Sequence, residues 1–151
     1  MVDTVRDPSV VLKALKQALQ TDVRTKDMVV KCMEVANTNP DLAKRGWVSL
    51  YADADEYTPR TAGAGRGNWN WNPTLRAIVQ ASDLSSGEGT LEKLGVYLKA
   101  VVDVVLANKT LAEHVEALTN IRVEYAIRED DAKSLHFIGA LVTMQFDGRS
   151  N

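Results

Sequence analysis

The strongest constraint on the fold is a long amphipathic stretch from about Thr90 to Asn108. Its large apolar residues recur at alternating three- and four-residue steps, the spacing of one helix face, and they are Leu91, Leu94, Leu98, Val101 and Val105. Burying these side chains contributes on the order of 10 kcal/mol before chain entropy is subtracted, so the stretch must pack on something. The sequence therefore predicts a central helix lying across a sheet or a second helix.

A shorter helix is predicted to begin at Asp7, whose carboxylate can cap free backbone amides while Pro8 occupies the first helical position. Its apolar face comprises Val11, Ala14, Leu15, Ala18 and Leu19. Residues 28–35 then suit either a short amphipathic helix or a strand buried on both faces, and we favour the strand. The Asn-Thr-Asn-Pro sequence at 37–40 ends this element, because a residue before proline avoids helical geometry.

Two alternating stretches predict a hairpin of strands, at 46–57 and 69–81. The first predicted strand has a polar face with Trp47, Ser49, Tyr51, Asp53, Asp55 and Tyr57, and the second has an apolar face with Trp69, Trp71, Leu75, Ala77, Val79 and Ala81. The connection at 58–68 is basic, rich in glycine and longer than the usual hairpin loop, so it is a candidate arm that reaches a partner.

After the central helix, Thr110 and Glu113 have the spacing of a capping box, which predicts a short helix through Leu118. Strands at 121–128 and 135–146 follow, joined as a second hairpin by the acidic link Glu129, Asp130 and Asp131. The predicted fold class is α+β: a two-layer sandwich with a mostly antiparallel sheet, on which the N-terminal helix and the long central helix pack. Residues 1–151 are expected to form a single domain.

Composition argues against several classes of function. The formal net charge is −2, so no large positive field draws the chain onto nucleic acid phosphates. No apolar run is long enough to span a membrane, and the first six residues lack a signal-peptide pattern, so we expect a soluble protein made in a cytoplasm. The single cysteine, Cys32, has apolar neighbours and is expected to be a buried structural thiol.

The polar residues do not form a recognisable catalytic or metal-binding pattern. His114 and His136 have no second ligand at zinc-like spacing. His114 is expected on the surface of a short helix, and for His136, which flanks the last predicted strand, a structural role is favoured over a catalytic one. The Gly63–Gly67 segment superficially resembles a phosphate-binding loop, but it leads into a strand instead of a helix N-terminus. We therefore expect no enzyme activity, no cofactor, no metal and no catalytic residue.

Two groups of residues have alternative readings. Asp53, Asp55 and Glu56 could be paired carboxylates, but a solvated strand face is favoured, or an acidic channel surface that repels DNA phosphate. Core packing is the favoured account of Trp69 and Trp71, and an exposed one would indicate a protein interface.

Four segments resemble the tail terminator family of long-tailed bacteriophages, which includes the lambda-type terminator. They are GWVSLYADADEYTPR, NPTLRAIVQASD, LEKLGVYLKAVVDVVLANKTL and LTNIRVEYAIREDDAKSLHFIGALVTMQF. The similarity runs from about Trp47 to Phe146 and also includes the short N-terminal helix. It lies in the order of the segments and in their local sequence character, and not in an invariant motif. It implies a structural virion protein of the tail or neck, assembled in the host cytoplasm.

The resemblance implies a hexameric ring that binds the last ring of tail tube protein, stops polymerisation and offers a surface for head–tail connector or neck proteins. DNA would pass through its pore without specific binding, and no membrane would be involved. We predict inter-subunit or partner contacts by Arg60, Arg66, Trp69 and Trp71, and pore or rim acids at Asp53, Asp55, Glu129, Asp130 and Asp131. The alternatives are another neck component, such as a head completion or joining protein, and a small ligand-binding or nucleotide-binding enzyme domain.

Overall fold

Two helices and five strands make up the described part of the chain. The computed structural model describes residues 7–33, 45–59, 69–82, 87–126 and 137–150. In chain order the elements are α1 (Pro8–Thr21), β1 (Val29–Cys32), β2 (Trp47–Pro59), β3 (Trp69–Ser82), α2 (Gly87–Ala107), β4 (Ala117–Ala126) and β5 (Phe137–Ser150). The short strand β1 confirms the strand interpretation of residues 28–33 over the helical one.

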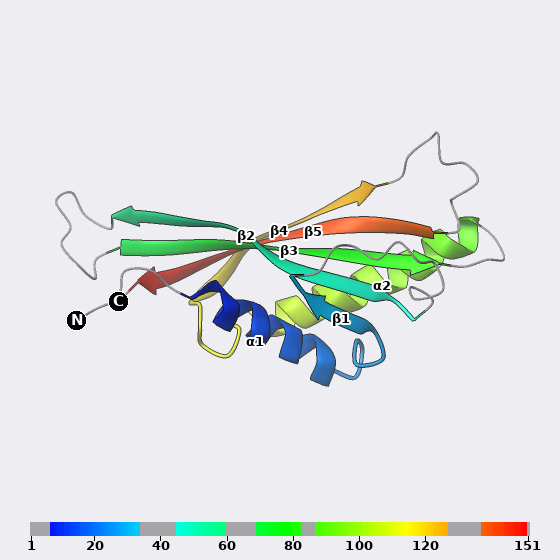
Figure 1. The fold of residues 1–151 in the computed structure, drawn as a ribbon, viewed down its shortest axis with the longest axis horizontal. Helices are drawn as coiled ribbons and strands as arrows, with labels where there is room; N and C mark the ends of the chain where they lie inside the picture. Colours follow the sequence, from blue (N-terminus) through cyan, green and yellow to red (C-terminus); the bar gives the residue numbers. More distant parts are fainter. Residues whose placement is uncertain (1–6, 34–44, 60–68, 83–86, 127–136, 151) are drawn as a thin grey trace.

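The strands form one mixed sheet in the order β1-β2-β3-β5-β4. β1 runs parallel to β2, and every other neighbouring pair is antiparallel. Both predicted hairpins are therefore confirmed, β2 with β3 and β4 with β5, and the two are joined through a long β3–β5 ladder (Figure 1). Among the described strands, β1 and β4 form the two edges of the sheet.

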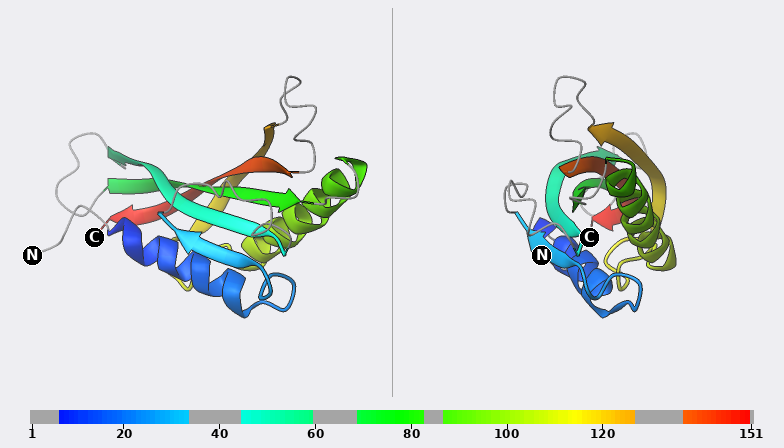
Figure 2. Two further views of the ribbon diagram at one scale, coloured as in Figure 1. Left: turned by 45° about the vertical axis from the view of Figure 1, so that its right-hand side comes forward. Right: turned by 90° about the vertical axis from the view of Figure 1, so that its right-hand side faces the viewer.

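Both helices cover the same face of this sheet, which confirms the two-layer α+β architecture (Figure 2). α2 packs on β3 and β5, whereas α1 packs on β1 and β2 and touches α2. The apolar core between the layers includes Val48 and Leu50 of β2, Leu75 of β3 and Met144 of β5. The opposite face of the sheet has no described helix over it, and we call it the open face.

Each helix largely follows its sequence pattern. In α1 the Asp7 carboxylate accepts a hydrogen bond from the Ser9 amide at 2.9 Å, as expected of a cap. Hydrogen bonding from the Ser9 side chain, and then from its amide, lowers the pKa of Asp7. In α2 four residues of the predicted stripe are buried, but Leu91 is 48% exposed, so that prediction was wrong. Thr90, fully buried, takes the inward position of that turn, and Leu91 lies on the flank of the helix.

A β-bulge at Asp53 corrects the predicted polar face of β2. The β2–β3 register shifts between Ala52 and Ala54, so that Ala52 opposes Leu75 while Tyr57 opposes Trp71. The extra residue reverses the alternation, because opposed residues of antiparallel strands lie on the same face. Tyr57 therefore packs against the core, and the expectation that it shares the polar face with Trp47 was wrong.

The predicted short helix from Thr110 to Leu118 is absent, and β4 already begins at Ala117. Leu111, Ala112 and Glu113 instead have positive φ values of 44°, 56° and 69°. Leu111 and Val115 are buried, and the Glu116 amide donates to the Asp147 carbonyl at 2.7 Å. Burial of these two side chains and docking on β5 thus outweigh the local capping pattern.

Candidate assembly surfaces

Several of the residues predicted to make contacts lie outside the described residues. They are Arg60 and Arg66 of the basic segment and Glu129, Asp130 and Asp131 of the acidic link. Their roles as partner contacts or rim acids therefore stay predictions. Trp69, Trp71, Asp53 and Asp55 are described.

The two tryptophans of β3 differ in exposure. Trp71 is 1% exposed and belongs to the core, which confirms the core-packing alternative for it and places its ring inside the subunit. Trp69 is half-buried at the first position of β3, opposite Ser150 of β5. Of the two, Trp69 is the one that offers apolar surface to a partner.

The bulge separates Asp53 from Asp55. The Asp53 Oδ2 atom lies 3.4 Å from Arg76 Nε, and Arg76 opposes Tyr51 and Thr143 on the open face. Asp55 opposes the buried Pro73, on the helix-covered side of the sheet. The expectation that the two carboxylates share one face was therefore wrong, and they do not form a pair.

One edge of the sheet, formed by β4, carries an apolar surface that we call the β4 edge surface. It consists of Ile121, Val123 and Tyr125 together with an open groove against α2. The groove has a volume of about 560 Å³ and is lined by Val102, Leu106, Lys109, Leu118, Thr119, Asn120 and Ile121. Tyr125 is 59% exposed, and Leu106 is exposed as well. A free strand edge beside exposed apolar side chains is a surface that favours pairing with another chain.

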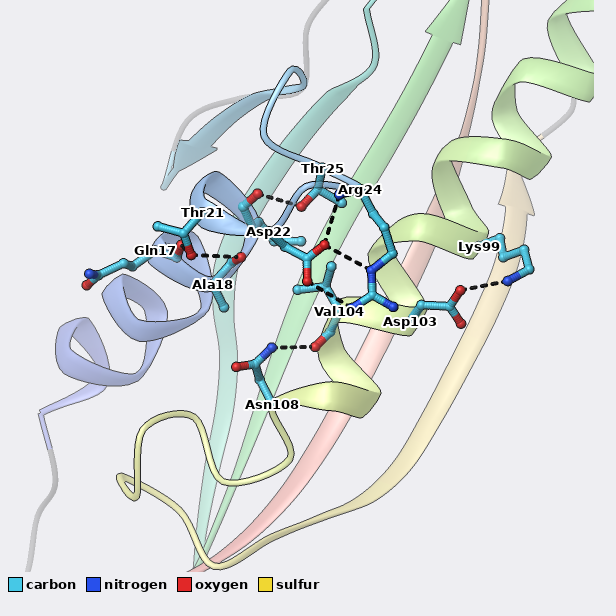
Figure 3. Close-up of polar contacts among 11 residues, drawn as sticks. Gln17, Ala18, Thr21, Asp22, Arg24, Thr25, Lys99, Asp103, Val104 and Asn108 are labelled. Atoms are coloured by element: carbon cyan, nitrogen blue, oxygen red, sulfur yellow. Dashed lines mark hydrogen bonds and ion pairs between the residues drawn. The ribbon is translucent and has the colours of Figure 1, made fainter.

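The opposite edge is formed by β1, and two exposed apolar residues flank this strand: Val23 in the α1–β1 turn, 75% exposed, and Met33 directly after β1, 67% exposed. We call this the β1 edge surface. The turn between α1 and β1 is held by Asp22, whose carboxylate accepts hydrogen bonds from the Arg24 amide, Nε and Nη2 at 2.8–2.9 Å (Figure 3). These bonds lower the pKa of Asp22 to about 2. The buried Thr25 hydroxyl donates to the Leu19 carbonyl, so the turn has a defined shape.

The open face carries aromatic, hydroxyl-bearing and charged side chains. The Trp47 indole donates to Ser49 Oγ at 2.9 Å, and both residues lie on β2. Arg122 and Glu124 of β4 form an ion pair at 2.9 Å, and they oppose Thr143 and Leu141 of β5. The alternation of apolar residues with Arg122 and Glu124 is visible in the sequence, but no motif there marks these residues as a contact site.

A cleft of about 460 Å³ lies between α1 and the left-handed turn formed by Leu111–Glu113, and its lining includes Lys13, Gln17, Asn108 and His114. The Asn108 amide is held by the Val104 carbonyl at 2.8 Å (Figure 3). His114 is exposed, as expected of a surface histidine. Cys32 is half-buried, and its burial raises the pKa of the thiol, which keeps the sulfur in its less reactive form.

Within the described ranges, no group of three or more histidine, cysteine or acidic side chains is placed to hold a metal ion. In the same residues no helix is long and apolar enough to cross a membrane.

Comparisons with known proteins give loose structural likenesses. No family model and no curated protein matches the chain. One solved protein without a functional description aligns over 92% of this chain and 90% of its own, at 15% identity and a TM-score of 0.49. Another is the PVC sheath/tube terminator of an extracellular contractile injection system, at 10% identity and a TM-score of 0.40. The alignment covers 97% of this chain but 58% of that terminator, so this chain spans little more than half of its length.

Proposed function

We propose that this protein is a structural, non-enzymatic component of a phage tail that forms a ring and caps the tail tube. The observation that carries the proposal is that the sheet ends in two unlike edges, β1 and β4, at opposite ends of the strand order. Exposed apolar side chains lie on β4, at Tyr125, and directly after β1, at Met33. Unlike surfaces on opposite sides of one subunit are what a head-to-tail contact requires, and such contacts close into rings when the rotation permits.

Closure of a ring would also pair the exposed backbone groups of the two edge strands. A β-strand with an unpaired edge presents backbone donors and acceptors that other chains can pair with, and a closed ring leaves no such edge free. The tail terminator family resembled by the sequence supplies the expected ring size, a hexamer, and the expected partners, the tail tube protein and the neck proteins. Residues Arg60, Arg66 and Trp69 are the proposed partner contacts, and Glu129, Asp130 and Asp131 the proposed rim acids.

Capping then follows from asymmetry between the two ring faces. One face binds the last ring of tube subunits, and the other does not reproduce the contacts that a further tube ring needs. The energy comes from binding alone, so no bond is made or broken.

The test is tube growth. Tail tube subunits of the same phage are polymerised with and without this protein, and tube lengths are measured by electron microscopy. We expect shorter tubes that no longer grow when more subunits are added. Tubes of unchanged length distribution at a molar excess of this protein would contradict the proposal.

A pair of variants sharpens this test. Met33→Asp places a charge on the β1 edge surface, at a left-handed position that Asp tolerates well. Val96→Asp places the same charge on an exposed site in the middle of α2. Met33→Asp is expected to weaken capping several-fold, whereas Val96→Asp leaves it near the wild-type level. Equal effects of the two variants would argue against the β1 edge as a ring contact.

A further inference from the structure

The central part of β4 has a sequence that is complementary to itself. Ile121, Val123 and Tyr125 oppose core residues of β5 and lie on the helix-covered side. Arg122 and Glu124 oppose Thr143 and Leu141 and lie on the open face. A second copy of β4 laid antiparallel along the free edge, with Val123 opposite its own counterpart, therefore brings Arg122 opposite Glu124 twice.

The same register matches the apolar side. With Val123 on the axis, Tyr125 of one copy stands opposite Ile121 of the other. Ile121 lines the groove of about 560 Å³ between β4 and α2, together with Val102, Leu106 and Leu118. Tyr125 is exposed in the single subunit, so the one aromatic side chain of β4 lies beside the groove of the opposite copy. Tyr125 of each copy is thus placed to pack into the groove of the other copy.

Backbone geometry allows this register whether the odd-numbered or the even-numbered residues of β4 direct their amide and carbonyl groups away from β5. In an antiparallel pair with Val123 opposite itself, outward-pointing residues of one copy always meet outward-pointing residues of the other. In the single subunit, Arg122 Nε and Glu124 Oε1 already form an ion pair at 2.9 Å. Both side chains are exposed, so they can exchange partners across the strand pair.

From this complementarity we infer that the protein forms a two-fold symmetric dimer, by antiparallel pairing of β4 with β4 of a second copy. The dimer joins two five-stranded sheets into one continuous sheet, and the contact closes on itself because it is isologous. This inference does not rest on the proposed function. It also predicts competition, since a β4 edge held in the dimer is not available to a head-to-tail neighbour in a ring.

The first test measures mass against concentration for the purified protein, by sedimentation equilibrium. We expect a species of twice the 16.6 kDa mass of one chain. Arg122→Glu places like charges opposite each other at two symmetry-related positions and should weaken the dimer at least about tenfold. Glu124→Arg should do the same, and the double swap of both residues should restore dimerisation to within about threefold of the wild type.

Lys26→Glu is the matched control, because it makes the same charge change at an exposed site in the α1–β1 turn. It should leave the dimer unchanged. A protein that stays monomeric at all concentrations, or a dimer that Arg122→Glu does not weaken more than Lys26→Glu, would overturn the inference. Single swaps that weaken the dimer without recovery in the double swap would overturn the proposed register.

The second test fixes the register with cysteines, in a Cys32→Ser background. Val123→Cys should give a covalent dimer on mild oxidation, because directly opposed residues lie about 4.5–5.5 Å apart between Cα atoms, within disulfide range. Ile121→Cys alone should not, because the two copies lie about 13 Å apart along the strands. A mixture of Ile121→Cys and Tyr125→Cys proteins should cross-link. The reverse pattern would rule out pairing about Val123.

The outcomes separate this inference from the proposed function. A free dimer together with uncapped tubes would support the inference and contradict only the tube-capping role. Capped tubes formed by a protein that is monomeric when free would do the opposite.

Discussion

Trp71 of β3 lies directly against Gly148 of β5, its partner in the antiparallel ladder. A Cβ atom at position 148 would come within 3.0 Å of Trp71 Cε3 and 3.5 Å of the Trp71 carbonyl oxygen. The indole is a rigid core group with 1% exposure, so it cannot move aside as the end of a flexible chain would. The glycine thus makes room for the largest buried side chain of the sheet.

Gly148→Ala should therefore destabilise the protein, by about 1–3 kcal/mol, the usual cost of overpacking a core. The measurement is the free energy of unfolding from a urea titration followed by tryptophan fluorescence. A neutral or stabilising effect would show that the indole does not depend on Gly148 for its position.

Gly95 provides the opposite case. It lies in the middle of α2, and a Cβ atom there meets nothing within 4 Å. Gly95→Ala should stabilise the protein by about 0.5–1 kcal/mol, because alanine loses less backbone entropy in a helix. The same urea titration checks it, and a loss of stability would mean that this flank of α2 is covered.

The left-handed turn at Leu111–Glu113 gives a third prediction. A non-glycine residue in this conformation costs about 1 kcal/mol, and Ala112 is exposed, so Ala112→Gly removes strain without removing core contacts. We expect a stabilisation of up to about 1 kcal/mol. Ala100→Gly, inside α2, is the control and should cost about 1 kcal/mol. Destabilisation of similar size by both substitutions would contradict the left-handed geometry.

The Asp22 carboxylate makes stability depend on acidity. Its pKa is about 2 in the folded protein against 3.8 ordinarily, because it accepts hydrogen bonds from Arg24. The stabilisation that the ionised Asp22 carboxylate gives the folded protein is therefore fully present above pH 3.8, and it is lost as the pH falls through 2. Asp22→Asn should lower the thermal midpoint at pH 7, and the difference from the wild type should shrink toward pH 2. The exposed neighbour Asp27, changed to Asn, should show a smaller difference at pH 7.

The sequence predicted those parts of the fold that follow from local periodicity. The Asp7 cap, the apolar stripe of α2 and both hairpins depend on residues that lie close together in the chain. The bulge at Asp53 was not predictable in this way, because it is defined by the register with β3, and the alternation of β2 gives no sign of it. The turn at Leu111–Glu113 was missed for a similar reason: burial of Leu111 and Val115, a non-local effect, overrides the Thr110–Glu113 pattern.

The candidate surfaces were harder still to predict. Which strands lie at the edges depends on two pairings: β3 pairs with β5, which is not the next strand in the sequence, and β1 pairs with the next strand, β2, in parallel and not as a hairpin. Arg122, Glu124 and Tyr125 acquire a possible partner only once β4 is known to be an edge. The residues chosen from the sequence, Trp69 and Trp71, were chosen for their type, and the structure buries one of them.

The most direct test of the ring proposal is cryo-electron microscopy of tail tube ends incubated with this protein, averaged in views along the tube axis. The account predicts a six-fold ring of additional density at one end of each tube, with all copies in the same orientation. Bare tube ends, with this protein recovered only in the unbound fraction, would contradict it.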